Sequence, residues 1–318
     1  MSTVTEHRIE AVVARKAVEA EGVVSLALRS ADGAALPAWH PGAHIDLIVD
    51  GVATRQYSLC GDPANTAEYR LAVLREDEGA LSRHVFDALA EGDHVGIGGP
   101  RNHFRFVPAP RYRFVAGGIG ITPMLPMILA AEAAGAQWEL HYGGRSRSTM
   151  AFLPELAQYG DRIHVWAKDE GRRLDLGTVL ANPEDDTLVY TCGPERLLSE
   201  IEDVMGATWP HGALHLERFA AKPLAEPERA GSFEIVLSRS GRILVVPPDR
   251  SILSVVEEAG IGVLSSCATG TCGTCDTPVL EGVPEHRDAV LTEDERAAND
   301  CMMICVSRSL SDRLVLGL

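Results

Sequence analysis

The first hundred residues alternate apolar and polar positions in short runs, a pattern typical of strands with one buried face. Turn signals such as Asp32-Gly33 and Gly61-Asp62-Pro63 separate these runs. We expect strands at 10–17, 23–29, 44–49, 54–59, 69–74 and 94–98. Closely spaced strands joined by such turns indicate a small antiparallel barrel.

The pattern changes near Arg111, where strand-like apolar runs begin to alternate with longer helical segments. We expect helices at 123–134 and 151–159, and strands at 112–116, 138–142, 163–167 and 188–191. Strands that alternate with helices indicate a parallel α/β sheet. The segment FAAKPLAEPERAG at 219–231 contains two prolines and no periodicity, which is typical of a linker.

A third pattern follows the linker. We expect a pair of strands at 233–238 and 242–246, a helix at 252–259 and a final strand at 313–316. The sequence therefore predicts a multidomain chain of β and α/β type. The expected parts are a barrel over 1–108, an α/β domain over 109–222, a linker over 223–232 and a third domain over 233–318.

Composition and charge narrow the classes of function. The chain is 46% hydrophobic and 23% charged, which is typical of an ordered globular protein. A net charge of -16 argues against a nucleic-acid partner, which needs a basic face. No run approaches roughly 18 consecutive apolar residues, and residues 1–10 lack a signal-peptide pattern. We therefore expect a cytoplasmic protein that binds neither nucleic acid nor a membrane.

Cysteines crowd the last quarter of the chain. Cys267, Cys272 and Cys275 follow the pattern C-x4-C-x2-C, and Cys305 follows after 29 further residues. This is the spacing of plant-type [2Fe-2S] ligands, and glycines between them let the backbone curl tightly. Zinc sites, the alternative, prefer paired C-x2-C units. Cys301 is an alternative fourth ligand, but we favour Cys305 because it begins an apolar run suited to a buried strand end.

Two further motifs lie at predicted strand ends. The segment RQYSL at 55–59 places Arg55 and Tyr57 on one strand face and Ser58 on the other, although an ordinary exposed strand also fits this pattern. The turn at 117–120 follows a strand and opens a helix, with Thr122 as the expected N-cap. Pro123 would then occupy the first helical position. Such a turn can hold a pyrophosphate, but it is not a full G-x-G-x-x-G motif.

Segments from all three predicted domains resemble the phthalate dioxygenase reductase family and the similar reductases of vanillate demethylase. They are RQYSLC at 55, GPRNHF at 99, VAGGIGITPML at 115, YTCGPERLL at 190, LERF at 216, SCATGTCGTC at 266 and CVSRS at 305. The resemblance implies an FMN-binding barrel, an NAD-binding domain and a C-terminal plant-type ferredoxin domain of β-grasp fold, in that order. The cluster ligands would be Cys267, Cys272, Cys275 and Cys305.

The same resemblance implies roles for individual residues. Arg55 would neutralise the FMN phosphate, Tyr57 would lie against the flavin, and Ser58 would hydrogen-bond near flavin N5. A second phosphate contact would come from the turn before Ser82, where Ala80-Leu81 replaces a Gly-Gly found in some relatives. The full set of expected cofactor contacts is Arg55, Gln56, Tyr57, Ser58, Ser82, Gly117, Gly118, Gly120, Thr122, Pro123, Arg145, Cys192, Gly193, Pro194 and Phe219.

Three side chains are expected to be catalytic. By the resemblance they are Ser58, Cys192 and Glu217. Arg145 follows a strand that ends near the expected adenosine ribose, where it would also suit a 2′-phosphate. The family likeness favours NADH over NADPH.

The resemblance implies an NAD(P)H-dependent oxidoreductase that serves as the electron-transfer component of a multicomponent oxygenase. Hydride from NADH would reach FMN, and electrons would pass singly through the [2Fe-2S] cluster to a terminal Rieske non-haem iron oxygenase or demethylase. One alternative is a self-contained flavin reductase acting on a small acceptor such as a quinone. The ferredoxin-like end argues against it, because such an enzyme needs no cluster. Another alternative is a binding protein with a zinc-filled cysteine loop.

Overall fold

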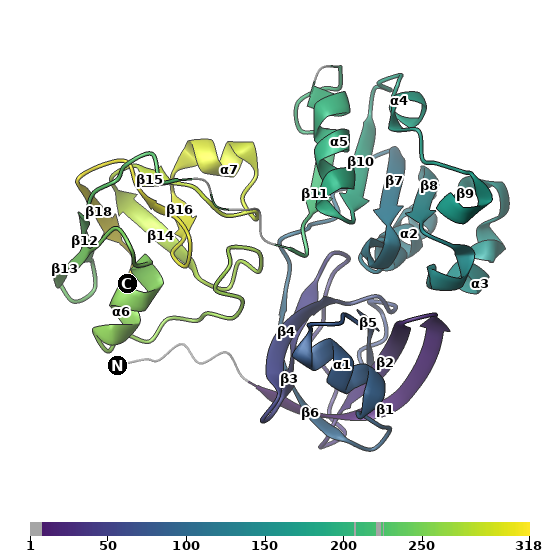
Figure 1. Ribbon diagram of the computed structural model, residues 1–318, viewed down its shortest axis with the longest axis horizontal. Coiled ribbons are helices and arrows are strands. Elements are labelled where there is room, and N and C mark those ends of the chain that lie inside the picture. Colours follow the sequence, from purple (N-terminus) through teal and green to yellow (C-terminus); the bar gives the residue numbers. More distant parts are fainter. Residues whose placement is uncertain (1–7, 207, 221–223, 225) are drawn as a thin grey trace. The chain divides into compact units, whose positions relative to one another are not determined.

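The computed structural model describes residues 8–206, 208–220, 224 and 226–318. The chain divides into two compact units (Figure 1): the first runs to Phe219, and the second runs from Ala220 to Leu318. Positions 223 and 225 of the expected linker lie outside the described residues. No helix in the described part of the chain is both long and apolar enough to cross a bilayer.

The first unit begins with an antiparallel barrel of six strands in the order β4-β3-β6-β1-β2-β5. The strands are β1 (Ile9–Ala20), β2 (Val23–Ser30), β3 (His44–Val49), β4 (Ala53–Ser58), β5 (Tyr69–Leu74) and β6 (His94–Arg101). An antiparallel bridge between Leu59 and Leu71 connects the two ends of this order, so the sheet closes. Leu26, Leu47 and Ile97 fill its interior, and helix α1 (Ala80–Asp87) packs against β4 and β5.

A parallel sheet of five strands follows, in the order β11-β10-β7-β8-β9. The strands are β7 (Arg111–Gly117), β8 (Gln137–Gly144), β9 (Ile163–Ala167), β10 (Thr187–Cys192) and β11 (Leu214–Glu217). The helices and 3-10 turns are η1 (Gly118–Ile121), α2 (Met124–Ala133), η2 (Arg147–Thr149), α3 (Leu153–Leu156), η3 (Ala157–Arg162), η4 (Lys168–Glu170), α4 (Leu176–Val179) and α5 (Glu195–Gly206). Neighbouring residues of β7 point to opposite faces: Phe114 packs with Ile128 of α2, whereas Val115 packs with Ile201 of α5. Helices therefore cover both faces of the sheet, as expected for a parallel α/β domain.

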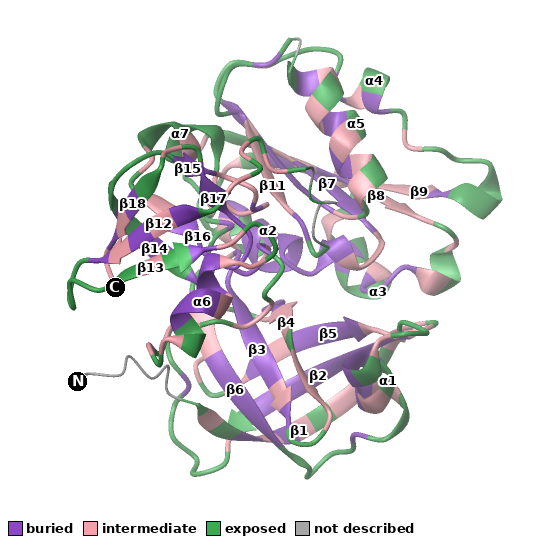
Figure 2. Cartoon of the chain, turned by 60° about the vertical axis from the view of Figure 1, so that its left-hand side comes forward, coloured by how far each residue is buried: buried purple, intermediate pink, exposed green. Residues whose placement is uncertain are grey.

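The second unit holds a mixed sheet in the order β13-β12-β18-β14-β16. Its elements are β12 (Phe233–Leu237), β13 (Ile243–Val246), α6 (Ile252–Glu258), β14 (Asp276–Glu281), α7 (Glu293–Ala298), β16 (Cys301–Met303) and β18 (Arg313–Leu316), with a separate pair β15 (Pro284–Glu285) and β17 (Arg308–Ser309). Helix α6 packs Ile252 and Val256 against Ile235 and Leu316 of the sheet. In Figure 2, buried residues lie along the strands of both units.

Three local predictions are wrong. Thr122 is not an N-cap, because η1 leads directly into α2 and the Thr122 hydroxyl donates back to the Ile119 carbonyl at 3.0 Å. Pro123 precedes α2 rather than opening it. The helix expected at 151–159 shortens to α3, since Phe152 adopts a left-handed φ of 64° just before it and the chain continues after Leu156 as the 3-10 segment η3.

Candidate functional site

The four motif cysteines converge from two segments of the second unit. Cys267, Cys272 and Cys275 lie in the loop between α6 and β14, and Cys305 lies in the turn after β16 rather than at a strand end. Gly270 has a φ of 73°, and a Cβ there would approach Val306 Cγ2 to 2.6 Å. A glycine at this position therefore lets the loop reach the turn that carries Cys305.

The sulfurs form two pairs. The Cys272 thiol and the Thr269 N–H, 3.3 Å from the Cys267 sulfur, hydrogen-bond to Cys267 and lower its pKa. Contact with Cys305, together with burial, raises the pKa of Cys275. Each pair offers two ligands to one iron, as a [2Fe-2S] cluster with four thiolates requires.

The spacing of the sulfurs distinguishes two irons from one zinc. In the described part of the chain, no three of the cysteine sulfurs lie within 4.8 Å of one another. A tetrahedral zinc with Zn–S bonds of about 2.3 Å would hold its sulfurs roughly 3.8 Å apart. The residues present therefore fit a two-iron cluster. Cys301 contacts Asp276 and Asp300 instead, and burial followed by these carboxylates raises its pKa to about 12, which favours Cys305 as fourth ligand.

Strand β4 carries residues 55–58 of the RQYSL motif, in which Gln56 and Tyr57 are half-buried and Ser58 is buried. Arg55 is exposed, and burial raises the pKa of the Tyr57 hydroxyl to about 12. The Gln56 amide donates to Asp46 Oδ1 at 2.8 Å. In the first turn of α1, the Ser82 hydroxyl donates to the Gly79 carbonyl at 3.1 Å. Since α1 packs against β4, the start of this helix and the motif belong to one side of the barrel.

Asp46 lies on the same side of the barrel as β4 and the start of α1, and none of the sequence motifs indicated it. It pairs with Arg101 at 2.7 Å, and both side chains are largely buried. The pair connects β3 to β6, while Gln56 adds the link to β4. Arg101 lies in the GPRNHF segment, which is the one sequence signal that could have indicated the pair.

Ser58, Cys192 and Glu217 meet where the barrel joins the parallel sheet. The Ser58 hydroxyl donates to Glu217 Oε2 at 3.3 Å, and Cys192 pairs with Glu217 in the register of β10 and β11. Desolvation raises the pKa of Glu217 to about 8. Burial, and then the Glu217 carboxylate, raises the pKa of the Cys192 thiol well above its usual value. At neutral pH the junction therefore holds three neutral, proton-bearing side chains.

The two nucleotide turns also meet. Strands β7 and β10 are parallel neighbours, so the turns that follow them lie at the same sheet edge. A Cβ on Gly120 would lie 2.2 Å from the Cys192 carbonyl oxygen, and one on Gly117 would lie 2.7 Å from Pro194 Cδ. Gly118 adopts a positive φ of 55°, a backbone conformation that favours glycine. The close approach of the two turns therefore depends on glycine.

Gly120→Ala should consequently disturb this edge of the sheet. Overpacking typically costs about 1–3 kcal/mol, and here the added methyl would overlap backbone atoms that cannot rotate away. We expect lower thermal stability and a raised KM for NADH with ferricyanide as acceptor. Gly206→Ala, which adds a methyl to open space at the end of α5, is the matched control. If Gly120→Ala behaved like this control, the packing argument would be wrong.

Arg145 and Phe219, two of the expected cofactor contacts, lie outside the groups of residues described above. Arg145 is exposed just after β8, and its carbonyl accepts the Asp169 N–H at 3.0 Å. Nearby Arg147 is held by Glu170 at 2.6 Å. Phe219 ends the first unit with a side chain that is 46% exposed. These residues remain predictions that no contact in the described structure supports directly.

Comparisons with known proteins agree with this arrangement. Family models match residues 235–310 as a 2Fe-2S iron-sulfur cluster binding domain and residues 114–203 as an oxidoreductase NAD-binding domain. Vanillate O-demethylase oxidoreductase from Pseudomonas putida is 39% identical over 98% of this chain and 100% of its own length.

Solved structures extend the likeness. Phthalate dioxygenase reductase superposes with a TM-score of 0.69 and 36% identity, covering 98% of both chains. An intact type IV self-sufficient cytochrome P450 monooxygenase superposes with a TM-score of 0.93 and 44% identity, covering 98% of this chain and 41% of that one. The chain thus spans about two fifths of the P450 and almost all of the two reductases.

The expected fold class, oxidoreductase type and cofactors (FMN, NADH and [2Fe-2S]) are confirmed. Full-length identity well above 30%, in a chain whose cysteines pair as two irons require, shows that the protein belongs to the phthalate dioxygenase reductase family.

Proposed function

We propose that this chain oxidises NADH at FMN bound to its barrel and passes electrons singly through its [2Fe-2S] cluster to a terminal Rieske oxygenase. One observation supports the oxidation of NADH at FMN. Ser58 of the barrel and Cys192 and Glu217 of the parallel sheet come together at one junction, with 3.3 Å between Ser58 Oγ and Glu217 Oε2. A flavin and a nicotinamide held by these two domains would meet at such a junction.

The chain's own residues would bind the flavin and control protons around it. The exposed Arg55 suits a phosphate, because a guanidinium donates two hydrogen bonds at once. Ser82, at the start of α1, would add a hydroxyl, while Gln56 fixes β4 through Asp46 and Tyr57 offers a ring face. FMN supplies the conversion of a two-electron donor into two one-electron steps. Ser58 and Glu217 would hold a proton beside the reacting edge.

The nucleotide would lie over the two turns at the sheet edge. Glycines 117, 118 and 120 let a pyrophosphate approach the backbone, and Thr122 and Pro123 continue the helical start behind them. Cys192, Gly193 and Pro194 would face the nicotinamide, with the Cys192 thiol kept neutral by burial. Arg145 would serve the adenosine end, and Phe219 would shield the flavin.

A Rieske centre is a favourable acceptor on energetic grounds. Plant-type clusters have reduction potentials near -400 mV, whereas Rieske centres lie between about -150 and +300 mV. Electron transfer between them is therefore downhill. The names of the related reductases, a vanillate O-demethylase oxidoreductase and a phthalate dioxygenase reductase, support a demethylase or dioxygenase as the partner. The likeness to a self-sufficient P450 makes a haem acceptor the alternative that the test must distinguish.

The test is an anaerobic visible spectrum of the purified protein before and after NADH, with flavin and iron measured on the same sample. We expect overlapping flavin and iron-sulfur bands that both bleach. The reduced protein is then mixed with a Rieske oxygenase or with a P450 haem domain, and acceptor reduction is followed by stopped flow. Faster reduction of the haem would overturn the Rieske assignment. Quinone reduction that survives loss of the cluster and exceeds reduction of both oxygenases would favour the self-contained flavin reductase.

Arg55→Ala should weaken FMN binding. Hydrogen bonds to charged groups contribute about 1.5–3 kcal/mol, which corresponds to a loss of affinity of roughly 10- to 150-fold. Fluorescence titration of the deflavinated protein with FMN measures the effect. Arg15→Ala, on the exposed surface of β1, is the matched control. Equal affinities of the two variants would remove Arg55 from the phosphate site.

A further inference from the structure

Three side chains that the reductase site does not use gather on β8 and β9. Glu139 and His141 are two residues apart on β8, so they project from the same face of the sheet. The alternate residues Trp138, Leu140 and Tyr142 pack with α2, so Glu139 and His141 belong to the other face. His164 on β9 lies opposite His141 in the parallel register. Figure 1 shows the two strands side by side at the edge of the sheet.

The potential ligand atoms of these three side chains converge. Glu139 Oε1 lies 3.4 Å from His141 Nε2, and Glu139 Oε2 lies 3.5 Å from His164 Nε2. The imidazole rings stack with centroids 4.6 Å apart and 18° between their planes. In the described part of the chain, no other group of three His, Cys, Asp or Glu side chains has its ligand atoms all within 4.8 Å of one another.

These distances are poor for hydrogen bonds but suit a shared metal ion. N–H···O bonds cluster near 2.9–3.0 Å, so contacts of 3.4 and 3.5 Å are long. In a tetrahedral site with Zn–N of about 2.0–2.1 Å and Zn–O of about 2.0–2.2 Å, neighbouring ligand atoms lie roughly 3.3–3.5 Å apart. Each imidazole therefore lies at a ligand-like distance from one oxygen of the Glu139 carboxylate, His141 from Oε1 and His164 from Oε2.

His141 provides an independent observation. Its side chain is only 9% exposed, and neither ring nitrogen has a partner in hydrogen-bonding geometry within the described structure. Buried polar atoms are almost always satisfied, so a buried imidazole with no partner in hydrogen-bonding geometry and with Nε2 near a carboxylate requires an explanation. A metal ion bound by Nε2 would satisfy that nitrogen of the ring.

Two arginines lie close to the three side chains. Arg113 Nε donates to Glu139 Oε1 at 2.6 Å. Each carboxylate oxygen has two lone pairs, so this bond leaves one on Oε1 for a metal. Arg113 and Arg172 both oppose a cation here, and the anionic Glu139 offsets part of that repulsion.

We propose that Glu139, His141 and His164 form a binding site for Zn²⁺ on the nucleotide-binding domain, separate from the cysteine loop. Two imidazoles and one carboxylate are a common ligand set for this ion, with a fourth position open to water. A bound ion would tie edge strand β9 to β8. Strand β9 is mostly half-buried, as Figure 2 shows, so the site is accessible to an ion from solvent.

The test uses the full protein with its flavin and cluster in place. The protein is dialysed to equilibrium against Zn²⁺, and zinc and iron are measured on the same sample. We expect one zinc beside two irons per chain. Unchanged iron shows that the cysteines have not exchanged their metal. Absence of retained zinc, or zinc that appears only as iron is lost, would refute the site.

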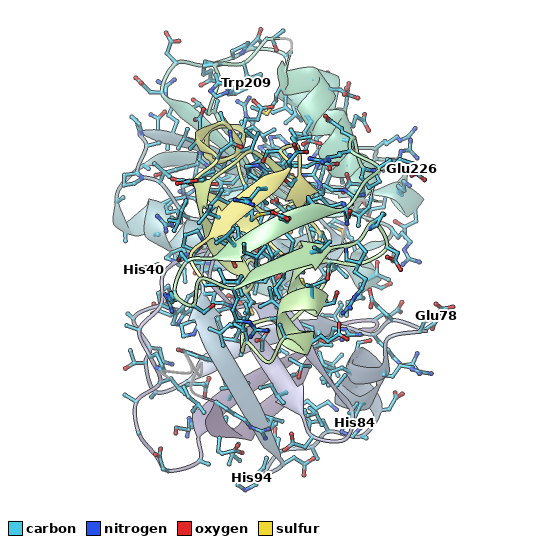
Figure 3. The ribbon with its side chains drawn as sticks, turned by 90° about the vertical axis from the view of Figure 1, so that its left-hand side faces the viewer. His40, Glu78, His84, His94, Trp209 and Glu226 are labelled. Atoms are coloured by element: carbon cyan, nitrogen blue, oxygen red, sulfur yellow. The ribbon has the colours of Figure 1, made fainter. Side chains whose placement is uncertain are left out.

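Single substitutions at His164 and His94 test which side chains bind the zinc ion. His164→Gln, on the partly exposed edge strand, should weaken zinc binding by more than about tenfold, because even changes to residues that merely orient ligands cost 10- to 100-fold. His164→Cys should retain zinc, because a thiolate can replace the imidazole. His94→Gln, at the exposed start of β6 and labelled in Figure 3, is the matched control and should bind like the parent. Equal zinc retention by His164→Gln and His94→Gln would overturn the proposal.

Discussion

Cys272→Ser should abolish NADH-driven reduction of cytochrome c while sparing reduction of ferricyanide. Cys272 pairs with Cys267, so its loss leaves one iron with a single thiolate. The flavin-binding and nucleotide-binding residues lie in the other unit of the chain, so NADH oxidation at the flavin should continue. Cytochrome c reduction should fall to background, because the one-electron path through the cluster is lost. The two assays are run on one preparation, with its iron content determined.

Cys301→Ser is the matched control for this experiment. Cys301 is four residues from Cys305, yet it contacts Asp276 and Asp300 rather than another cysteine. Its variant should keep two irons per chain and full cytochrome c activity. Loss of iron from Cys301→Ser would reassign the fourth ligand. Cytochrome c activity that survives in Cys272→Ser would remove the cluster from the electron path.

The barrel strands were predictable because each has a local alternation of apolar and polar residues, and the folded strands keep it. Strands β3 and β5 have the bounds that their apolar patterns predicted. Helix α5 also carries a local signal, since Leu198, Ile201 and Met205 recur at helical spacing, but it was not identified. Helix α7 buries none of its residues, so hydrophobic periodicity could not reveal it; its sequence signal is the capping box of Thr292 and Glu295.

The candidate sites also differ in how much of each could be predicted from the local sequence. Three of the four expected ligand cysteines lie within one loop, so their spacing alone indicates the metal. Ser58 and Glu217 are 159 residues apart, and only the fold brings them to 3.3 Å. The Glu139–His141–His164 group depends on the parallel register of β8 and β9. Side-chain contacts set by strand order and register cannot be obtained from local periodicity.

Glu217→Gln should remove a large pH dependence of stability. Desolvation raises the Glu217 pKa from 4.5 to about 8 in the folded protein. Between these values the unfolded chain releases the proton while the folded chain retains it, so the free energy of unfolding falls as pH rises. This contribution is fully present below about pH 4.5 and is lost by pH 8. A pKa rise of 3.5 (8 minus 4.5) corresponds to at most about 5 kcal/mol.

The amide that replaces the Glu217 carboxyl cannot titrate, so the variant should show a flatter profile of stability between pH 5 and pH 8.5 in denaturant unfolding. Glu78→Gln, on an exposed turn and labelled in Figure 3, should keep the parent profile. Catalysis provides a second readout, because the parent would lose its proton beside Ser58 as pH passes about 8. NADH oxidation should therefore decline above that pH in the parent and stay level in Glu217→Gln. Parallel pH profiles in the two proteins would mean that Glu217 is already ionised at neutral pH, and that the junction is not a neutral site.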